Sequence, residues 1–200
     1  MTRLAMILLP FLYSTVSMAA VQPTGGGPAA PPDAAGLYLA LDRLQVLGSV
    51  LYVAAHPDDE NTSVLAYFAQ GRHYDTAYLS LTRGGGGQNL IGDERDAELA
   101  VLRTQELMAA RRLDGARQYF TRAVDFGYSK SAAESLAVWG KEQILADVVW
   151  VIRKFRPDVI ITRFPVSGGG HGHHTASALL AGEAFQAAGD PDRFPEQLEY

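Results

Sequence analysis

The sequence contains no cysteine. This absence excludes disulfide bonds, cysteine-based zinc sites, a cysteine nucleophile and a lipid anchor on an N-terminal cysteine. Any bound metal ion must therefore be held by histidine, aspartate or glutamate side chains.

The sequence also lacks a strong excess of one charge. Its formal net charge is -5 over 200 residues, and the lysines and arginines are scattered rather than clustered. This distribution argues against a nucleic-acid partner. Basic pairs such as Arg111-Arg112 are predicted to be solvated helix ends. A hydrophobic content of 48% suits one globular domain.

No apolar run is long enough to cross a bilayer. The run over residues 4–13 has about ten residues, against the roughly twenty that a spanning helix needs. It follows Arg3 and precedes the small-x-small pattern Ser17-Met18-Ala19. We therefore predict a signal peptide over residues 1–20, a secreted or periplasmic protein, and no membrane contact beyond this export signal. An uncleaved N-terminal anchor is the alternative.

The segment after the signal peptide is rich in proline, glycine and alanine. Residues 21–36 are predicted to be a linker because they offer little apolar surface to bury. One domain is predicted over residues 37–200. The chain ends at Glu199-Tyr200 without a closing signal, which is consistent with a fragment of a longer protein that lacks late strands.

Short apolar runs alternate with segments of helical spacing in the predicted domain. This pattern favours an α/β fold, a Rossmann-like three-layer sandwich with a mostly parallel sheet and helices on both faces. Functional sites in such sheets lie beyond the carboxyl ends of the strands. We predict buried strands over residues 49–55, 75–81, 116–120 and 158–164, and helices over residues 37–47, 60–72, 93–113, 136–155 and 174–188.

Four metal-capable side chains directly follow the first predicted strand. They are His56, Asp58, Asp59 and Glu60, with Pro57 restricting the backbone between them. Zinc hydrolases need imidazole and carboxylate ligands and a separate base for water. The alternative is an ordinary helix N-cap, but a cap needs only one carboxylate.

Three of the five histidines lie within four residues, after the last predicted strand. They are His171, His173 and His174, preceded by Gly168-Gly169-Gly170. The alternative is a chance histidine-rich loop. His73, at a predicted helix end, is interpreted as a surface residue.

Together the two motifs resemble those of the PIG-L/LmbE-like N-acetylglucosaminyl deacetylase family. That family has an apolar strand followed by A-H-P-D-D-E, and much later a strand followed by G-H-x-x-H. The first motif stands here over residues 55–60 and the second over residues 170–174. The resemblance covers roughly residues 50–189 and implies an N-acylated amino-sugar substrate.

The resemblance implies a role for each motif residue. His56, Asp59 and His174 correspond to three zinc ligands, with a fourth position open to water. Asp58 corresponds to the general base, and His171 to the group that stabilises the oxyanion, a role served best by an imidazolium. Iron(II) or cobalt(II) could occupy the same ligands as Zn²⁺.

One residue departs from the family pattern. The family often has aspartate one residue before the last metal ligand, and this chain has His173 there. A carboxylate at this place could favour a charged His171, which His173 cannot do.

A glycine-rich loop over residues 82–89 follows the second predicted strand. Family members have a glycine-containing loop that lines the substrate site, and the R-x-x-E segment at Arg103 resembles one whose arginine contacts substrate. The resemblance thus implies substrate contacts for Arg83, Gln88 and Arg103. The alternatives are a phosphate-binding loop, although neither nucleotide motif is matched, and an ordinary surface charge at Arg103.

The leading hypothesis is a zinc-dependent hydrolase that removes an N-acetyl or other acyl group from an amino sugar in a glycan, glycolipid or glycoside. One alternative is a metal-dependent amidase of other specificity, for instance on thiol-sugar conjugates or a peptidoglycan amide. Another is an inactive carbohydrate-binding module that retains the site.

Overall fold

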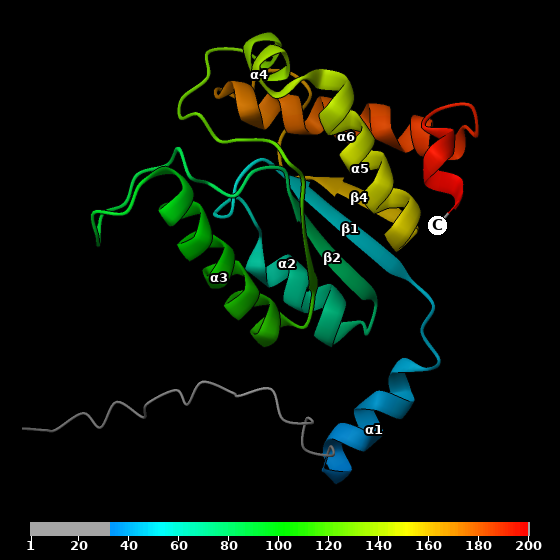
Figure 1. Ribbon diagram of the computed structural model, residues 1–200. Helices are drawn as coiled ribbons and strands as arrows, with labels where there is room; N and C mark the ends of the chain where they lie inside the picture. The colour runs from blue at the N-terminus through cyan, green and yellow to red at the C-terminus, as the bar shows by residue number, and fades with distance from the viewer. Residues whose placement is uncertain (1–32, 200) are drawn as a thin grey trace, which may run out of the picture.

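A sheet of four parallel strands forms the centre of the protein (Figure 1). The computed structural model describes residues 33–199, so the predicted signal peptide and most of the predicted linker lie outside the described residues. The spatial order is β3-β2-β1-β4, with β1 at Ser49–Ala54, β2 at Asp75–Ser80, β3 at Arg117–Phe120 and β4 at Val159–Thr162. The runs of valine, leucine and tyrosine in β1 and β2 suit strands that are covered on both faces.

Helices cover both faces of the sheet, which confirms the predicted three-layer α/β fold (Figure 1). One face carries α2 (Thr62–Ala66), the π-helical turn η1 (Tyr67–Gly71) and α3 (Asp96–Asp114). The other face carries α4 (Ala132–Trp139), α5 (Lys141–Phe155) and α6 (Gly172–Gly189). The N-terminal helix α1 (Ala34–Arg43) and the 3-10 turn η2 (Pro195–Glu199) lie outside these layers.

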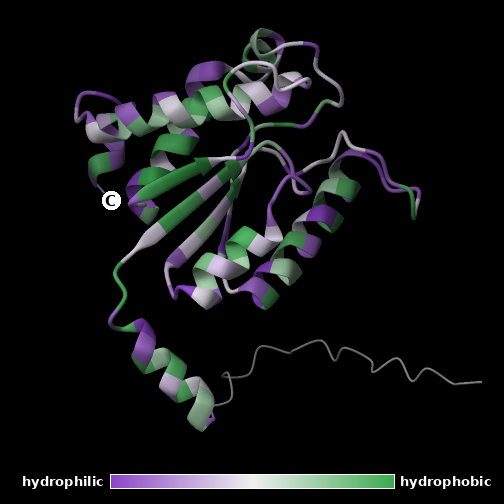
Figure 2. Ribbon diagram, turned by 180° about the vertical axis from the view of Figure 1, so that it is seen from behind, coloured by the Kyte–Doolittle hydropathy of each residue, from purple (hydrophilic) through white to green (hydrophobic). Residues whose placement is uncertain are grey.

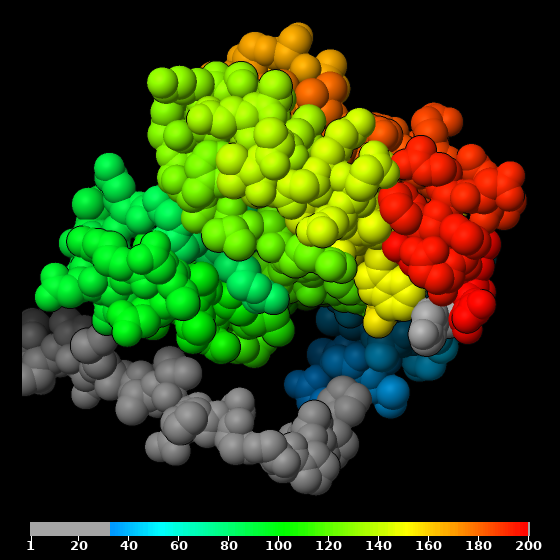
Figure 3. Space-filling view, turned by 45° about the horizontal axis from the view of Figure 1, so that its top comes forward, coloured from blue at the N-terminus to red at the C-terminus, as the bar shows by residue number. Residues whose placement is uncertain are grey.

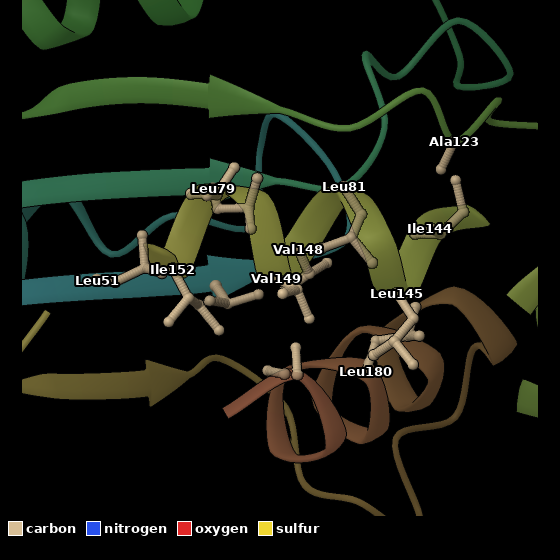
Figure 4. Packing of buried hydrophobic residues seen from close by; sticks show 14 of the residues in the cluster. Leu51, Leu79, Leu81, Ala123, Ile144, Leu145, Val148, Val149, Ile152 and Leu180 are labelled. Carbon is tan, nitrogen blue, oxygen red and sulfur yellow. The ribbon is translucent and has the colours of Figure 1, made fainter. Parts of the chain in front are cut away.

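The larger part of the core lies between the sheet and α5 and α6 (Figure 4). Leu51 and Leu79 of the strands pack with Val148 and Val149 of α5 and with Leu180 of α6, and all five are fully buried. A smaller cluster on the opposite face joins Tyr52 and Tyr78 to α2 and α3. Figure 2 shows the resulting pattern, apolar central strands under helices of mixed character.

The predicted helix over residues 136–155 is two helices. Gly140 has φ of 74°, a left-handed conformation that ends α4 before α5 begins. The start of α4 lies earlier than predicted because Ser131 caps it by accepting a hydrogen bond from the backbone N–H of Glu134. The Ser-x-x-Glu spacing of a capping box was present in the sequence and could have located this start.

Three further expectations need correction. Arg111 is not a solvated helix end, because its side chain is 3% exposed and paired with Asp114. β4 is not a fully buried strand, since it is the outermost strand of the described sheet and Val159 is about half exposed. Helix α1 begins at Ala34, inside the predicted linker, because Asp33 caps it.

The C-terminal segment is tied to α5 (Figure 3). The guanidinium of Arg153 donates hydrogen bonds to several backbone carbonyls, among them those of Ala187, Asp190 and Phe194. A cavity of ≈1110 Å³ lies beside this arginine, but its walls carry no histidine and the arginine is engaged with backbone. Among the described residues, no helix has the length and apolarity that crossing a membrane requires.

Candidate active site

The loop that follows β1 folds back on itself to place two side chains. The carboxylate of Asp59 accepts a hydrogen bond from the backbone N–H of His56 at 2.7 Å and lies 3.0 Å from the Nδ1 atom of the same histidine. The hydroxyl of Tyr78, on β2, donates to the carbonyl of His56. The imidazole and the carboxylate are therefore fixed together at the carboxyl end of the sheet.

The first turn of α6 brings the histidine cluster to the same edge. Nδ1 of His171 caps this helix by accepting a hydrogen bond from the backbone N–H of His173 at 3.2 Å. The ring of His174 stacks on that of Phe164, with centroids 3.7 Å apart. The rings of all three histidines lie with their centroids between 5.1 and 5.2 Å from that of His56, although more than a hundred residues separate them in sequence.

Gly172 allows this close approach between α6 and the start of α4. Its backbone N–H donates to the carbonyl of Ser129 at 2.8 Å. A Cβ atom at this position would lie 2.3 Å from the Oγ atom of Ser129 and 2.3 Å from the carbonyl oxygen of Ser131. Any side chain at Gly172 would therefore push the histidine-bearing end of α6 away from its support.

We expect Gly172→Ala to lower the free energy of unfolding by about 1–3 kcal/mol, the usual cost of overpacking. Gly182→Ala is the matched control, because it lies in the same helix with no atom within 4 Å of the added Cβ. That control should be neutral or stabilise the protein by about 1 kcal/mol through helix propensity. Urea unfolding of both variants measures the difference, and equal stabilities would contradict the packing argument.

Within residues 33–199, two overlapping groups of side chains could hold a metal ion. One is His56, Asp59 and His174, and the other is His56, His171 and His173. Within each group one candidate ligand atom per residue lies within 4.8 Å of the others. Either donor set suits a catalytic zinc ion, and the first is the set that the family resemblance implies and leaves His171 free.

The electrostatics of these side chains suit metal binding. Burial lowers the pKa of His174, so its imidazole is neutral at neutral pH. Burial alone would raise the pKa of Asp59, but the hydrogen bonds and charge of His56 outweigh it and leave that pKa below its ordinary value. Neutral imidazoles and an ionised carboxylate are the forms that bind metal ions.

The same shifts predict the acid sensitivity of the metal-free protein. Burial, reinforced by neighbouring histidines, lowers the pKa of His173 from 6.5 to about 3 and also lowers that of His171. The unfolded chain therefore binds protons first as the pH falls, so stability should be lost below about pH 6.5 and should not be lost above it. Thermal unfolding in chelator at about pH 7.5 and about pH 5 measures this loss. In His173→Asn the loss should be smaller, and an equal loss would show that His173 contributes none of it.

The side chain of Asp58 is open to solvent and lies in the same cavity as His56, His171 and His174. It is 69% exposed and pairs with Arg103, whose Nη2 lies 3.1 Å from its carboxylate. Arg103 is 16% exposed and also donates to the carbonyl of Gly84, so it is not an ordinary surface charge. Glu60, the last acid of the motif, turns inward, with its carboxylate 3.7 Å from the guanidinium of Arg111.

The glycine-rich loop makes room for Arg103. A Cβ atom at Gly84 would lie 2.7 Å from the Nη1 atom of Arg103, and one at Gly87 would lie 2.6 Å from it. Gly84 also has φ of 71°, which favours glycine. The loop therefore serves to seat an arginine beside Asp58, which gives a reason for its glycines other than phosphate binding.

These residues line one cavity of ≈470 Å³, a volume within the usual range for small-molecule sites. It includes Gln88 but not Arg83, whose guanidinium lies over the ring of Phe120, donates to Thr104 and borders a separate cavity. His73 is also remote from the site, half-buried beside Asp42. The lining residues are His56, Asp58, Asp59, Gly86, Gly87, Gln88, Arg103, Asp125, Gly127, Tyr128, His171 and His174.

Two side chains of this cavity, those of Asp125 and Tyr128, were not predicted. Asp125 follows β3, is 4% exposed, and lies with its Oδ1 atom 3.8 Å from Nδ1 of His173. Tyr128 donates from its hydroxyl to the carbonyl of Gly170. The rule that sites lie beyond the carboxyl ends of parallel strands applies to β3 as well, and it could have drawn attention to both.

The chain belongs to the PIG-L family, because residues 51–185 match the family model described as GlcNAc-PI de-N-acetylase. It is 30% identical over 194 residues to 1D-myo-inositol 2-acetamido-2-deoxy-alpha-D-glucopyranoside deacetylase 1 of Catenulispora acidiphila, covering 88% of this chain and 56% of that protein. It is 28% identical over 168 residues to the mycothiol S-conjugate amidase of Streptomyces coelicolor, covering 78% of this chain and 56% of that protein. The chain thus spans about half the length of these relatives.

Solved structures share the fold. The N,N'-diacetylchitobiose deacetylase of Pyrococcus horikoshii has a TM-score of 0.59 at 18% identity, covering 86% of this chain and 65% of that one. The 4-carboxy-2-hydroxymuconate hydratase of Pseudomonas putida has a TM-score of 0.56 at 21% identity, covering 74% of this chain and 59% of that one. Since one of these neighbours is a deacetylase and the other a hydratase, the fold alone does not define the reaction.

Proposed function

We propose that this chain carries the catalytic site of a zinc-dependent N-deacetylase that acts on an N-acetylated amino sugar. The observation that carries the proposal is the convergence of His56, Asp59 and His174 beside an exposed carboxylate, Asp58, in one cavity. Sequence relatives named as deacetylases of an N-acetylglucosamine-type substrate support it.

In this proposal His56, Asp59 and His174 hold the metal ion. A bound zinc ion would supply Lewis acidity, which polarises the acyl carbonyl and makes water more acidic. Iron(II) or cobalt(II) would fit the same donors. The rest of the chemistry belongs to side chains of the chain itself.

Asp58 is the proposed general base. Its exposed carboxylate takes a proton from water as the water oxygen bonds to the acyl carbon. The same proton is then delivered to the amide nitrogen as the C–N bond breaks, leaving acetic acid and a free amine, which ionise to acetate and an ammonium group in water. Arg103, which pairs with Asp58 in the absence of substrate, is positioned together with Gln88 to bind the sugar. Arg83 would need to leave Phe120 to join them.

His171 is the proposed hydrogen-bond donor to the oxyanion of the tetrahedral intermediate. Its Nδ1 accepts the capping hydrogen bond, so a neutral His171 carries its proton on Nε2 and can donate from there. Burial, together with the neighbouring histidines, lowers its pKa, which favours this neutral donor over the imidazolium expected from the sequence.

The test is to measure bound metal and acetate release together, on N-acetylglucosamine glycosides and oligomers. We expect about one zinc ion per chain and acetate release that stops on chelation and returns when zinc is added. Zinc binding without acetate release from any of these substrates would refute the N-acetyl-sugar proposal and leave a carbohydrate-binding module or another amidase.

An amidase acting on thiol-sugar conjugates is the second candidate. The similarity to a mycothiol S-conjugate amidase favours it, and the same catalytic groups would serve. Release of the acyl group from such a conjugate, faster than acetate from an N-acetyl sugar, would establish it.

We further propose that residues 1–20 are an export signal and that the mature protein is secreted or periplasmic. The support is the basic, apolar and small-residue pattern of the N-terminus. N-terminal sequencing of protein from the culture medium or periplasm should find a start near residue 20 or 21, whereas an intact N-terminus in the cytoplasm would refute the proposal.

A further inference from the structure

His173 occupies an unusual position behind the proposed metal site. Its side chain is fully buried, and its Nδ1 atom lies 3.0 Å from Nε2 of His56. Its ring packs against Trp139 and Phe126, with centroids 4.6 and 4.5 Å away. Among the described residues, its Nε2 is the one buried side-chain nitrogen or oxygen without a hydrogen-bond partner. A native structure rarely leaves such an atom unpaired without a reason.

The two nitrogens of His56 indicate which nitrogen of His173 carries the proton. Nδ1 faces Asp59, on the side of the proposed metal ion, so Nε2 must carry the proton when Nδ1 binds metal. Nδ1 of His173 is the acceptor at hydrogen-bond distance from that proton. An imidazole that accepts through Nδ1 carries its own proton on Nε2, which is the atom without a partner.

We propose that His173 is a positioning residue that orients His56 for metal binding, by accepting its Nε2–H as a neutral imidazole. This inference rests on the proposed function, because it takes His56 as a metal ligand. The partner behind a ligating histidine is commonly a carboxylate, a backbone carbonyl or water, and it fixes the ring and its tautomer. Here an uncharged ring serves, and it packs against the rings of two aromatic side chains.

The carboxylate that lies beside His173, that of Asp125, does not take over the role. Oδ1 of Asp125 lies 3.8 Å from Nδ1 of His173, beyond hydrogen-bond distance, and accepts instead from the backbone N–H of Gly127 at 2.9 Å. The orientation of His56 therefore depends on His173, and loss of this one acceptor nitrogen should weaken metal binding.

Three substitutions separate the acceptor atom from the bulk of the ring. Asparagine can place its amide oxygen near the position of Nδ1, and so can still accept from His56. Glutamine reaches toward the position of Nε2 instead, and phenylalanine fills the space with no acceptor at all. If only packing matters, His173→Phe should weaken zinc binding least. If the acceptor matters, His173→Asn should weaken it least.

The experiment is a competition between the purified protein and a zinc chelator, for wild type and the three variants. We expect His173→Asn to stay close to wild type, and His173→Gln and His173→Phe to bind zinc about 10- to 100-fold more weakly. The visible spectrum of the Co²⁺-loaded proteins reports the ligand geometry independently of activity. It should be retained in His173→Asn and altered in the other two variants.

Each contrary result has a distinct meaning. Equal zinc affinity in wild type, His173→Gln and His173→Phe would overturn the role of His173 and leave the proposed function intact. If His173→Asn binds zinc as weakly as His173→Gln, the role of His173 as an acceptor is overturned too, because the ring itself would then be what is needed. Two zinc ions in wild type and one in every variant would make His173 a ligand of a second metal, with His56 and His171. A wild type that binds no zinc would overturn the proposed function, and this inference with it.

Discussion

Asp58→Asn should lower kcat for acetate release by about 10²- to 10⁴-fold, the range that a positioned general base contributes. The amide cannot take the proton from water, yet it has nearly the same shape as the carboxylate. Zinc content should stay at the wild-type value, because Asp58 pairs with Arg103 and belongs to neither group of metal-capable side chains. Steady-state rates and metal analysis on the same preparation give both quantities.

Asp75→Asn is the matched control for the loss of one ion-paired carboxylate. Asp75 stands at the opposite end of the sheet, where it pairs with Arg117 at 2.9 Å and is 46% exposed. It should have the wild-type rate. If Asp58→Asn also keeps the wild-type rate while binding zinc, Asp58 is not the base. If it loses zinc, the metal site has been assigned to the wrong carboxylate.

The placement of the site could be predicted from the sequence because it depends on topology. His56 follows β1 and the histidine cluster follows β4, and these two strands are neighbours in a parallel sheet. Their carboxyl ends must then lie side by side, whatever the details of packing. The alternation of apolar runs and helical segments was sufficient to predict that sheet, and the structure confirms it.

The direction of each side chain could not be predicted in this way. Three consecutive acids follow Pro57, and the structure sends them three ways: Asp58 to solvent, Asp59 to His56 and Glu60 to Arg111. This division depends on a turn and on a buried arginine from α3, and local spacing carries no information about either. For the same reason, Arg83 was expected at the substrate and instead lies on Phe120.

Asp125 shows a different limit of the sequence. It has no histidine beside it and belongs to no recognised motif, so nothing local distinguishes it from a loop aspartate. Its place after β3 puts it near the edge of the sheet where sites lie, but only the structure gives its burial and its distance of 3.8 Å to His173. The structure therefore adds to the site a charged residue whose importance depends entirely on contacts that are distant in sequence.

His174→Phe should remove zinc binding and, with it, all metal-dependent acetate release. The phenyl ring keeps the stacking on Phe164 but cannot ligate, so the variant tests the ligand and not the packing. The loss of affinity should exceed the roughly 10- to 100-fold that changes behind a ligand produce. Zinc affinity from chelator competition is the measurement, and His73→Phe, remote from the cluster, should bind zinc as wild type does.

His171→Asn separates the two groups of metal-capable side chains. Asparagine preserves the helix cap that His171 provides, but it removes the Nε2–H proposed to donate to the oxyanion. If the metal lies with Asp59 and His174, this variant keeps its zinc and loses about 10²- to 10³-fold in kcat, the value of one oxyanion donor. If the metal lies with His171 and His173 instead, this variant loses zinc and His174→Phe retains it. The pair of variants therefore decides which side of His56 faces the metal, and so whether His171 is a catalytic donor or a ligand.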